Sequence, residues 1–194
     1  MILKTSTEEL LARSLEELLC EYAFEDISVK LLTSNCDTSR QTFYKHFSDK
    51  YALVCWIFSK QLLFAADTVA PERPWRETMA AMLRAVMENA PFYGKLLSVD
   101  AVAAELTGTA RGFFSEYAAA QLAGEPMTME MDFAIDFFSA ALVYKMASWV
   151  KRGFKEPPET LAAYLEDCLP ASLRPLFIER GRRLDYSAYE HGER

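Results

Sequence analysis

The chain has 194 residues, of which 51% are hydrophobic and 25% are charged, a balance typical of a folded protein rather than a disordered one. Lys and Arg total 21 against 28 Asp and Glu, so the formal net charge is −7. This acidic balance excludes a protein that coats nucleic acid through bulk positive charge, but it is compatible with a local basic surface.

Membrane, secretory and metal-binding classes are not expected either. The longest nearly apolar stretch covers residues 137–150 and contains Lys145, so it is shorter than the roughly 20 residues of a membrane span. The N-terminus has no long apolar run, and we therefore expect no signal peptide. Four widely spaced cysteines and two histidines indicate reduced thiols in a cytosolic protein, with no metal site and no cofactor.

The first part of the chain predicts four helices. No proline precedes Pro71 and no glycine precedes Gly94. Helical spacing of apolar residues predicts helices over residues 6–22, 28–34 and 39–47, followed by a longer one that Ser48 or Asp49 caps. A short helix, a four-residue break and a second short helix together form a helix-turn-helix pattern.

The remaining chain predicts further helices separated by Pro and Gly, and no strands. They cover residues 75–89, 91–97, 101–122, 128–153 and 158–168. The fold class is therefore all-α. Residues 171–194 form either a solvated tail, the default, or a tail with a short helix over residues 173–178 that packs on the body.

The third helix has the composition of a major-groove reader. Phe43 and Phe47 are four residues apart and predict a buried side. On the other side Arg40 or Lys45 could pair with guanine and Gln41 with adenine, while phenol, imidazole and ammonium groups suit phosphates. An ordinary solvated helix face is the alternative, and His46 fits packing or capping equally well. The candidate DNA-binding residues are Ser28, Ser39, Arg40, Gln41, Thr42, Tyr44, Lys45, His46 and Lys50.

Residues 10–58 resemble the DNA-binding domain of TetR-type transcriptional regulators. The resemblance rests on residues 27–54, which read ISVKLLTSNCDTSRQTFYKHFSDKYALV. The matching positions are Ser28, Ser39, Tyr44, His46, Phe47 and Lys50. The motif SRQTFYKHF followed by SDKY is similar to the sequences of the subgroup labelled regulators of dihydroxyacetone kinase. One departure is Asp37, where the family has Gly; Asp tolerates a positive φ better than most residues, so we expect the turn to form.

The resemblance implies a helix-turn-helix domain over residues 1–50 and an effector-binding and dimerisation domain over residues 51–170. A tail over residues 171–194 lies beyond the family pattern. Met and aromatic residues could line an adaptable apolar pocket or pack in the core: Met79, Met82, Met87, Phe92, Tyr93, Phe113, Phe114 and Tyr117. The expected dimer interface comprises Phe138, Leu142, Met146, Trp149, Leu161, Tyr164 and Leu165.

These observations lead to three functional hypotheses. The first is a cytoplasmic bacterial regulator, nucleoid-associated when bound, and more specifically a homodimeric repressor of a palindromic double-stranded operator that responds to an unknown small molecule. The second is a TetR-like coactivator that binds a protein partner instead of DNA. The third, an all-α enzyme, is disfavoured because no catalytic motif occurs; Asp132 and Asp136 are four apart, but such acidic faces are usually solvated.

Overall fold

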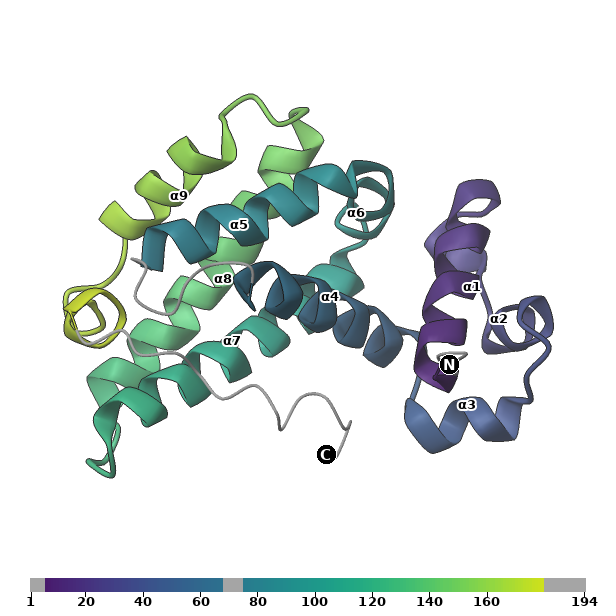
Figure 1. Cartoon of the computed structure of the whole chain (residues 1–194), viewed down its shortest axis with the longest axis horizontal. Coiled ribbons are helices and arrows are strands. Elements are labelled where there is room, and N and C mark those ends of the chain that lie inside the picture. Colours follow the sequence, from purple (N-terminus) through teal and green to yellow (C-terminus); the bar gives the residue numbers. More distant parts are fainter. Residues whose placement is uncertain (1–5, 68–74, 180–194) are drawn as a thin grey trace.

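The computed structural model describes residues 6–67 and 75–179, and every regular element in those two ranges is helical (Figure 1). The all-α prediction is confirmed, and the helix ends mostly agree with those predicted to within two residues. The elements are α1 (Thr7–Glu21), η1 (Phe24–Asp26), α2 (Val29–Asn35), α3 (Arg40–His46), α4 (Lys50–Asp67), α5 (Trp75–Glu88), α6 (Ala90–Leu96), α7 (Asp100–Leu122), α8 (Met129–Lys151), α9 (Pro158–Asp167) and η2 (Pro175–Glu179).

Helices α1, α2 and α3 form a small head at one end of the molecule (Figure 1). A capping box starts α1: the Ser6 hydroxyl accepts from the Glu9 amide, and the Glu9 carboxylate accepts from the Ser6 amide, both at 3.2 Å. Leu11 and Leu15 of α1 are fully buried together with Leu32 of α2. The head therefore has an apolar core of its own, and the buried Phe43 of α3 completes it.

The turn between α2 and α3 has a left-handed backbone at Asp37, as expected at a position where the resembled family has Gly. Asp37 has a φ of 50°. The next amide, that of Thr38, donates to the carbonyl of Thr33 at 2.9 Å and so closes the end of α2 in the manner of a Schellman motif. Asp37 thus occupies the position for which Gly is favoured, and the helix-turn-helix forms with it.

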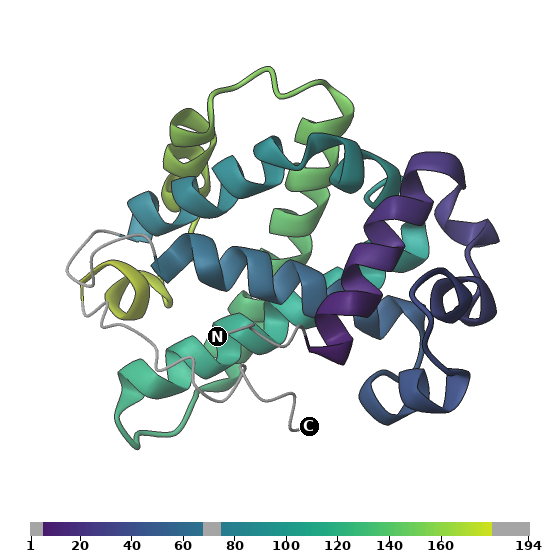
Figure 2. The same ribbon diagram turned by 45° about the vertical axis from the view of Figure 1, so that its right-hand side comes forward.

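Helix α4 runs from the head into the body, as both views show (Figures 1 and 2). Asp49 caps its start, because its Oδ1 accepts from the amides of Tyr51 and Ala52, each at 2.9 Å. Farther along, α4 packs against α5 and α7. One rigid element is therefore shared by the two parts of the chain.

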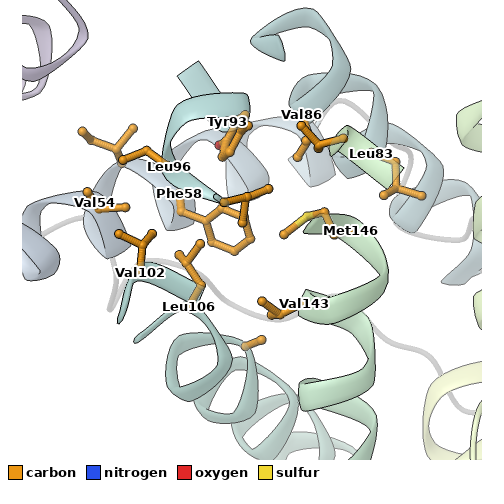
Figure 3. Close-up of a cluster of buried hydrophobic side chains, with 14 of the residues drawn as sticks. Val54, Phe58, Leu83, Val86, Tyr93, Leu96, Val102, Leu106, Val143 and Met146 are labelled. Carbon is orange, nitrogen blue, oxygen red and sulfur yellow. The ribbon is translucent and has the colours of Figure 1, made fainter. Parts of the chain in front are cut away.

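The body is a helical bundle in which α7 packs along α8, and α9 lies on α5. Figure 3 shows the junction near α4, where Phe58 lies among Tyr93 of α6, Leu106 of α7, and Val143 and Met146 of α8. All five side chains are at most 6% exposed. This cluster joins α4 firmly to the rest of the body.

Helix α8 is long and apolar enough to cross a bilayer by length and composition, with a mean hydropathy of 1.3 over its most apolar window. The core helix of a helical bundle meets the same criteria. One side of α8, which includes Phe138, Val143 and Trp149, is buried against the rest of the chain. Within its most apolar window 39% of the residues are buried, so α8 packs into the bundle along one side only.

The segment after α9 returns to the body instead of extending into solvent. Leu173, Leu176 and Phe177 are at most 2% exposed, and the Phe177 ring lies 5.6 Å from that of Phe114 and 4.8 Å from that of Tyr117. The packed alternative therefore holds for residues 171–178, and the default of a solvated tail does not hold there. Residues 180–194 lie outside the described part of the chain.

Candidate nucleic-acid interface

Helix α3 is fixed to the head by aromatic residues on one side. Phe43 is fully buried and Phe47 is 6% exposed, and their ring centroids lie 5.8 Å apart. At its start the Ser39 hydroxyl accepts from the Thr42 amide at 2.9 Å and lies 2.8 Å from the Thr42 hydroxyl. Ser39 and Thr42 therefore shape the first turn of the helix, as a capping residue and its partner do.

The opposite side of α3 presents four side chains of different chemistry. Arg40, Gln41, Tyr44 and Lys45 are all exposed, Tyr44 to 51%. A guanidinium and an amide can each form two hydrogen bonds to a purine edge, while a phenol and an ammonium suit phosphate oxygens. Because the two phenylalanines hold the helix, these groups are available without any change in the core.

Lys50 does not lie on this surface. Its Nζ donates to three backbone carbonyls: those of Phe24 at 2.7 Å, Ile27 at 2.9 Å and Glu25 at 3.1 Å. It also lies 4.4 Å from the centroid of the Phe24 ring, and partial burial lowers the pKa of its ammonium group. All three donors are used inside the protein, so the expected phosphate contact is replaced by a brace between α4 and the 3₁₀ turn η1.

His46 is an exposed residue, but its ring also contacts the protein. Its Nδ1 lies 2.9 Å from Oε1 of Glu8 in the first turn of α1. Partial burial acts to raise the pKa of Glu8, but the helix-start amide, Ser6 and His46 outweigh it and lower that pKa. Of the alternatives for His46, this geometry favours a structural tie between α1 and α3 over a free phosphate donor.

Ser28 has a capping role: its hydroxyl accepts from the Leu31 amide at 3.1 Å and so closes the first turn of α2. It is exposed at the edge of the helix-turn-helix. Of the nine candidates, the structure therefore brings four together on one outward face, and it uses Ser28, Ser39, Thr42, His46 and Lys50 in holding the motif together.

A small apolar cavity of about 80 Å³ lies in the body between α4, α5, α7 and α8. Its walls include four of the predicted pocket residues: Met79, Met82, Phe113 and Phe114. They also include residues that the sequence reasoning missed, because helical spacing does not show which helices meet: Phe58, Ser59, Leu83, Val86, Thr109, Ala110, Leu142, Val143 and Met146.

The other four predicted pocket residues lie elsewhere. Met87 is 37% exposed, and Phe92 is half-buried. Tyr93 is 1% exposed, and its hydroxyl donates to Oε1 of Gln61 at 2.6 Å; burial raises the pKa of this phenol. Tyr117 packs on Phe177.

Most residues expected at a dimer interface are buried inside the single chain. The buried ones, at most 8% exposed, are Phe138, Met146, Trp149, Leu161 and Leu165. Leu142 lines the cavity, and only Tyr164, at 56%, is well exposed. The physical reason is that α8 is apolar on both sides, and its Phe138 side faces the chain's own core.

The exposed apolar side of α8 consists of Met129, Phe133, Phe137 and Tyr144, which are 92%, 72%, 64% and 69% exposed. We call these four residues the α8 stripe. Their spacing of four, four and seven places them on one helix face over about 22 Å. Beside them, Arg111 of α7 pairs with Asp132 at 2.8 Å and with Asp136 at 3.2 Å, so these two carboxylates are not simply solvated.

Comparisons with known proteins identify the family of the chain and solved structures of similar fold. Residues 73–170 match the TetR-type family described as "Transcriptional regulator C-terminal region". The HTH-type dhaKLM operon transcriptional activator DhaS of Lactococcus lactis subsp. lactis (strain IL1403) is 28% identical over 94 residues, which are 48% of this chain and 50% of that protein. The match thus spans about half the length of this curated relative.

Two solved structures have a similar fold. The dihydroxyacetone kinase operon activator DhaS has a TM-score of 0.57 and 21% identity, over 90% of this chain and 99% of that one. The TetR family repressor AlkX from Dietzia sp. strain DQ12-45-1b, implicated in biodegradation of n-alkanes, has a TM-score of 0.50 and 12% identity, over 89% and 97%.

Proposed function

Because the chain belongs to the TetR family of DNA-binding transcriptional regulators, we propose that α3 reads an operator in the major groove and that the protein is a ligand-responsive homodimeric repressor. The observation that carries the proposal is the outward face of α3, where Arg40, Gln41, Tyr44 and Lys45 are exposed while Phe43 and Phe47 fix the helix from behind. Residues 1–50 are assigned to the DNA-binding head, 51–170 to the effector and dimerisation body, and 171–194 to a tail whose Leu173, Leu176 and Phe177 pack on that body. A DNA-binding regulator acts in the cytoplasm, and in a bacterium it would associate with the nucleoid when bound.

Selection of bound DNA from a random pool tests the operator assignment. We expect a palindrome whose half-sites are one helical turn apart, roughly 34 Å, because two copies of α3 must enter successive major grooves. Replacing Arg40 and Lys45 together by Ala should weaken binding at least about thirty-fold, since each base or phosphate contact is worth about 1–3 kcal/mol. The control replaces two exposed lysines of the body, Lys151 and Lys155, by Ala, so that both double variants have the same net charge. If the α3 variant binds the operator with unchanged affinity, α3 is not part of the DNA interface.

The α8 stripe supports a two-fold dimer. An exposed apolar row of this length is unusual on a monomer, and a two-fold axis would place each stripe against the other. Replacing Phe133 and Phe137 by Ser should convert the dimer to monomer in sedimentation experiments, whereas Ser at the exposed Met87 of α5 should not. A dimer that persists in the double variant would place the interface elsewhere.

The response to a ligand is assigned to α4. Lys50 ties its start to the head, and Phe58 and Ser59 farther along line the apolar cavity. A ligand that binds one arrangement of α4 better than another would shift the spacing of the two heads, and DNA affinity would change by the same differential free energy.

A second candidate is a coactivator that binds a protein through its head. Two observations favour it: the partial match to an activator, and the charge of residues 1–60, which contain seven Lys or Arg against nine Asp or Glu, a net of −2. A gel shift at low salt with DNA from upstream of the protein's own gene separates the two functions. No shift, together with stable capture of a second regulator, would favour the coactivator over the operator-binding repressor.

A further inference from the structure

The apolar cavity lies where a ligand would act on α4. Phe58 and Ser59 of α4 form one wall, and residues of α5, α7 and α8 form the others. In Figure 3, Phe58 points toward Met146 and Val143 of α8. A molecule inserted between these side chains would push α4 away from α8.

The lining offers almost nothing to a polar molecule. Among the described residues around the cavity, none is charged, and the only polar side chains are the hydroxyls of Ser59 and Thr109. The Thr109 hydroxyl already donates to the carbonyl of Glu105 at 3.0 Å, so it has acceptor capacity but no free proton. A polyol would leave several hydroxyls unpaired, and an anion or cation would be desolvated without a partner.

We propose that the effector is a compact, uncharged, mainly apolar molecule that carries at most one hydroxyl or carbonyl group. This inference rests on the proposed role of the cavity as the effector site. Carboxylates, amines, phosphate esters and small polyols are excluded by the lining. The one polar group of the ligand would meet the Ser59 and Thr109 hydroxyls.

The volume of about 80 Å³ sets a second condition. An apolar cavity of about 150 Å³ admits benzene, so this cavity must enlarge when it binds a molecule of six or seven carbons. Met79, Met82 and Met146 supply that freedom, because an unbranched thioether side chain can change rotamer at little cost. The ligand therefore enters by displacing methionine side chains.

The test follows the methionine methyl groups by NMR in the intact protein labelled at those methyls. The probes are toluene, 1-hexanol, hexanoate and glycerol; hexanol and hexanoate have chains of equal length, and hexanoate is charged. Toluene and hexanol should shift the methyl signals of Met79, Met82 and Met146 saturably, while those of the exposed Met87 and Met129 stay in place. Hexanoate should bind at least about tenfold more weakly than hexanol, and glycerol should not bind.

Two matched pairs of variants locate the site. Thr109→Val removes the hydroxyl without changing the shape, and should weaken hexanol about three- to tenfold while toluene is unaffected. Thr107→Val is its control, because Thr107 makes the same kind of bond, to Ala103 at 2.8 Å, but lies off the cavity. Ala110→Leu fills the cavity and should abolish binding of both probes, whereas Ala104→Leu on the exposed side of α7 should not. If the Ala110 variant does not fold, the isosteric Thr109 variant and the methyl shifts still decide the question.

The proposal is overturned if no saturable methyl shift occurs with toluene or hexanol, or if hexanoate or glycerol binds as well as they do. The NMR readout contains no DNA, so these failures are distinct from failure of operator binding. A protein that selects an operator but binds none of the apolar probes would remain a DNA-binding regulator, and the ligand assignment alone would be wrong.

Discussion

Replacing Lys50 by Met distinguishes a brace within the protein from a contact to DNA phosphate. The variant keeps the aliphatic length but leaves the carbonyls of Phe24, Glu25 and Ile27 without their donor and removes the ammonium group from the Phe24 ring. Each hydrogen bond to a charged group is worth about 1.5–3 kcal/mol. The site is half-buried, so water recovers part of this loss, and we expect the free energy of unfolding to fall by about 2–3 kcal/mol. For a chain of this size that lowers Tm by about 4–12 °C.

Urea and thermal denaturation, followed by circular dichroism, measure the loss. Lys45→Met is the matched control, because Lys45 is exposed on α3, and its loss should change stability by less than about 0.5 kcal/mol while weakening DNA binding. The brace assignment is refuted if Lys50→Met is as stable as the parent protein and instead loses operator affinity. That outcome would restore Lys50 to the phosphate-binding surface.

Three further predictions concern the head and its junction with the body. Asp37 has a φ of 50°, which Gly adopts without strain and Ala does not. In urea denaturation, Asp37→Gly should therefore raise the free energy of unfolding by up to about 1 kcal/mol, and Asp37→Ala should lower it by a similar amount. Equal stability of the two variants would contradict the left-handed turn. Glu8→Gln should cost about 0.5–1 kcal/mol at pH 7. Because partial burial is outweighed by the helix-start amide, Ser6 and His46, which lower the folded pKa of Glu8, the unfolded state binds more protons as the pH falls below about 4.5. This stabilisation is therefore lost as the pH falls through the folded pKa, and the two denaturation curves converge; a pH-independent gap would contradict the lowered pKa of Glu8. Lys95→Met should increase hydrogen exchange at the end of α1, because the Lys95 ammonium of α6 donates to the carbonyl of Leu19, and unchanged exchange there would remove this contact between body and head.

Local features of the head could be predicted from the sequence alone. Ser39 precedes α3 by one residue, and Phe43 and Phe47 are spaced by one helical turn, so the cap and the buried side follow from short-range geometry. The acceptors of Lys50 lie 23 to 26 residues upstream, and Glu8 lies 38 residues before His46. No local pattern brings such residues together, which is why Lys50 was expected at a phosphate and the role of His46 stayed open between a phosphate contact and packing or capping.

Which side of α8 faces the core could not be predicted from the sequence. Phe137 and Phe138 are adjacent and equally apolar, yet they are 64% and 3% exposed. Helical periodicity identifies an inward side only when the other side is polar, and α8 is apolar on both. The spacing of Met129, Phe133, Phe137 and Tyr144 can be read from the sequence, but the exposure of these side chains depends on where α7 packs.

In α3 the residues proposed to contact DNA are separate from those that stabilise the head, and this affects how the DNA target can change. Its outward residues, Arg40, Gln41, Tyr44 and Lys45, are exposed, while the stability of the head depends on Phe43 and Phe47 behind them. Mutations at the four outward positions can therefore accumulate, in evolution or in a randomised library, with little effect on folding yield. If α3 reads the operator as proposed, a lineage could change its DNA target through these four positions without changing the residues of the apolar cavity.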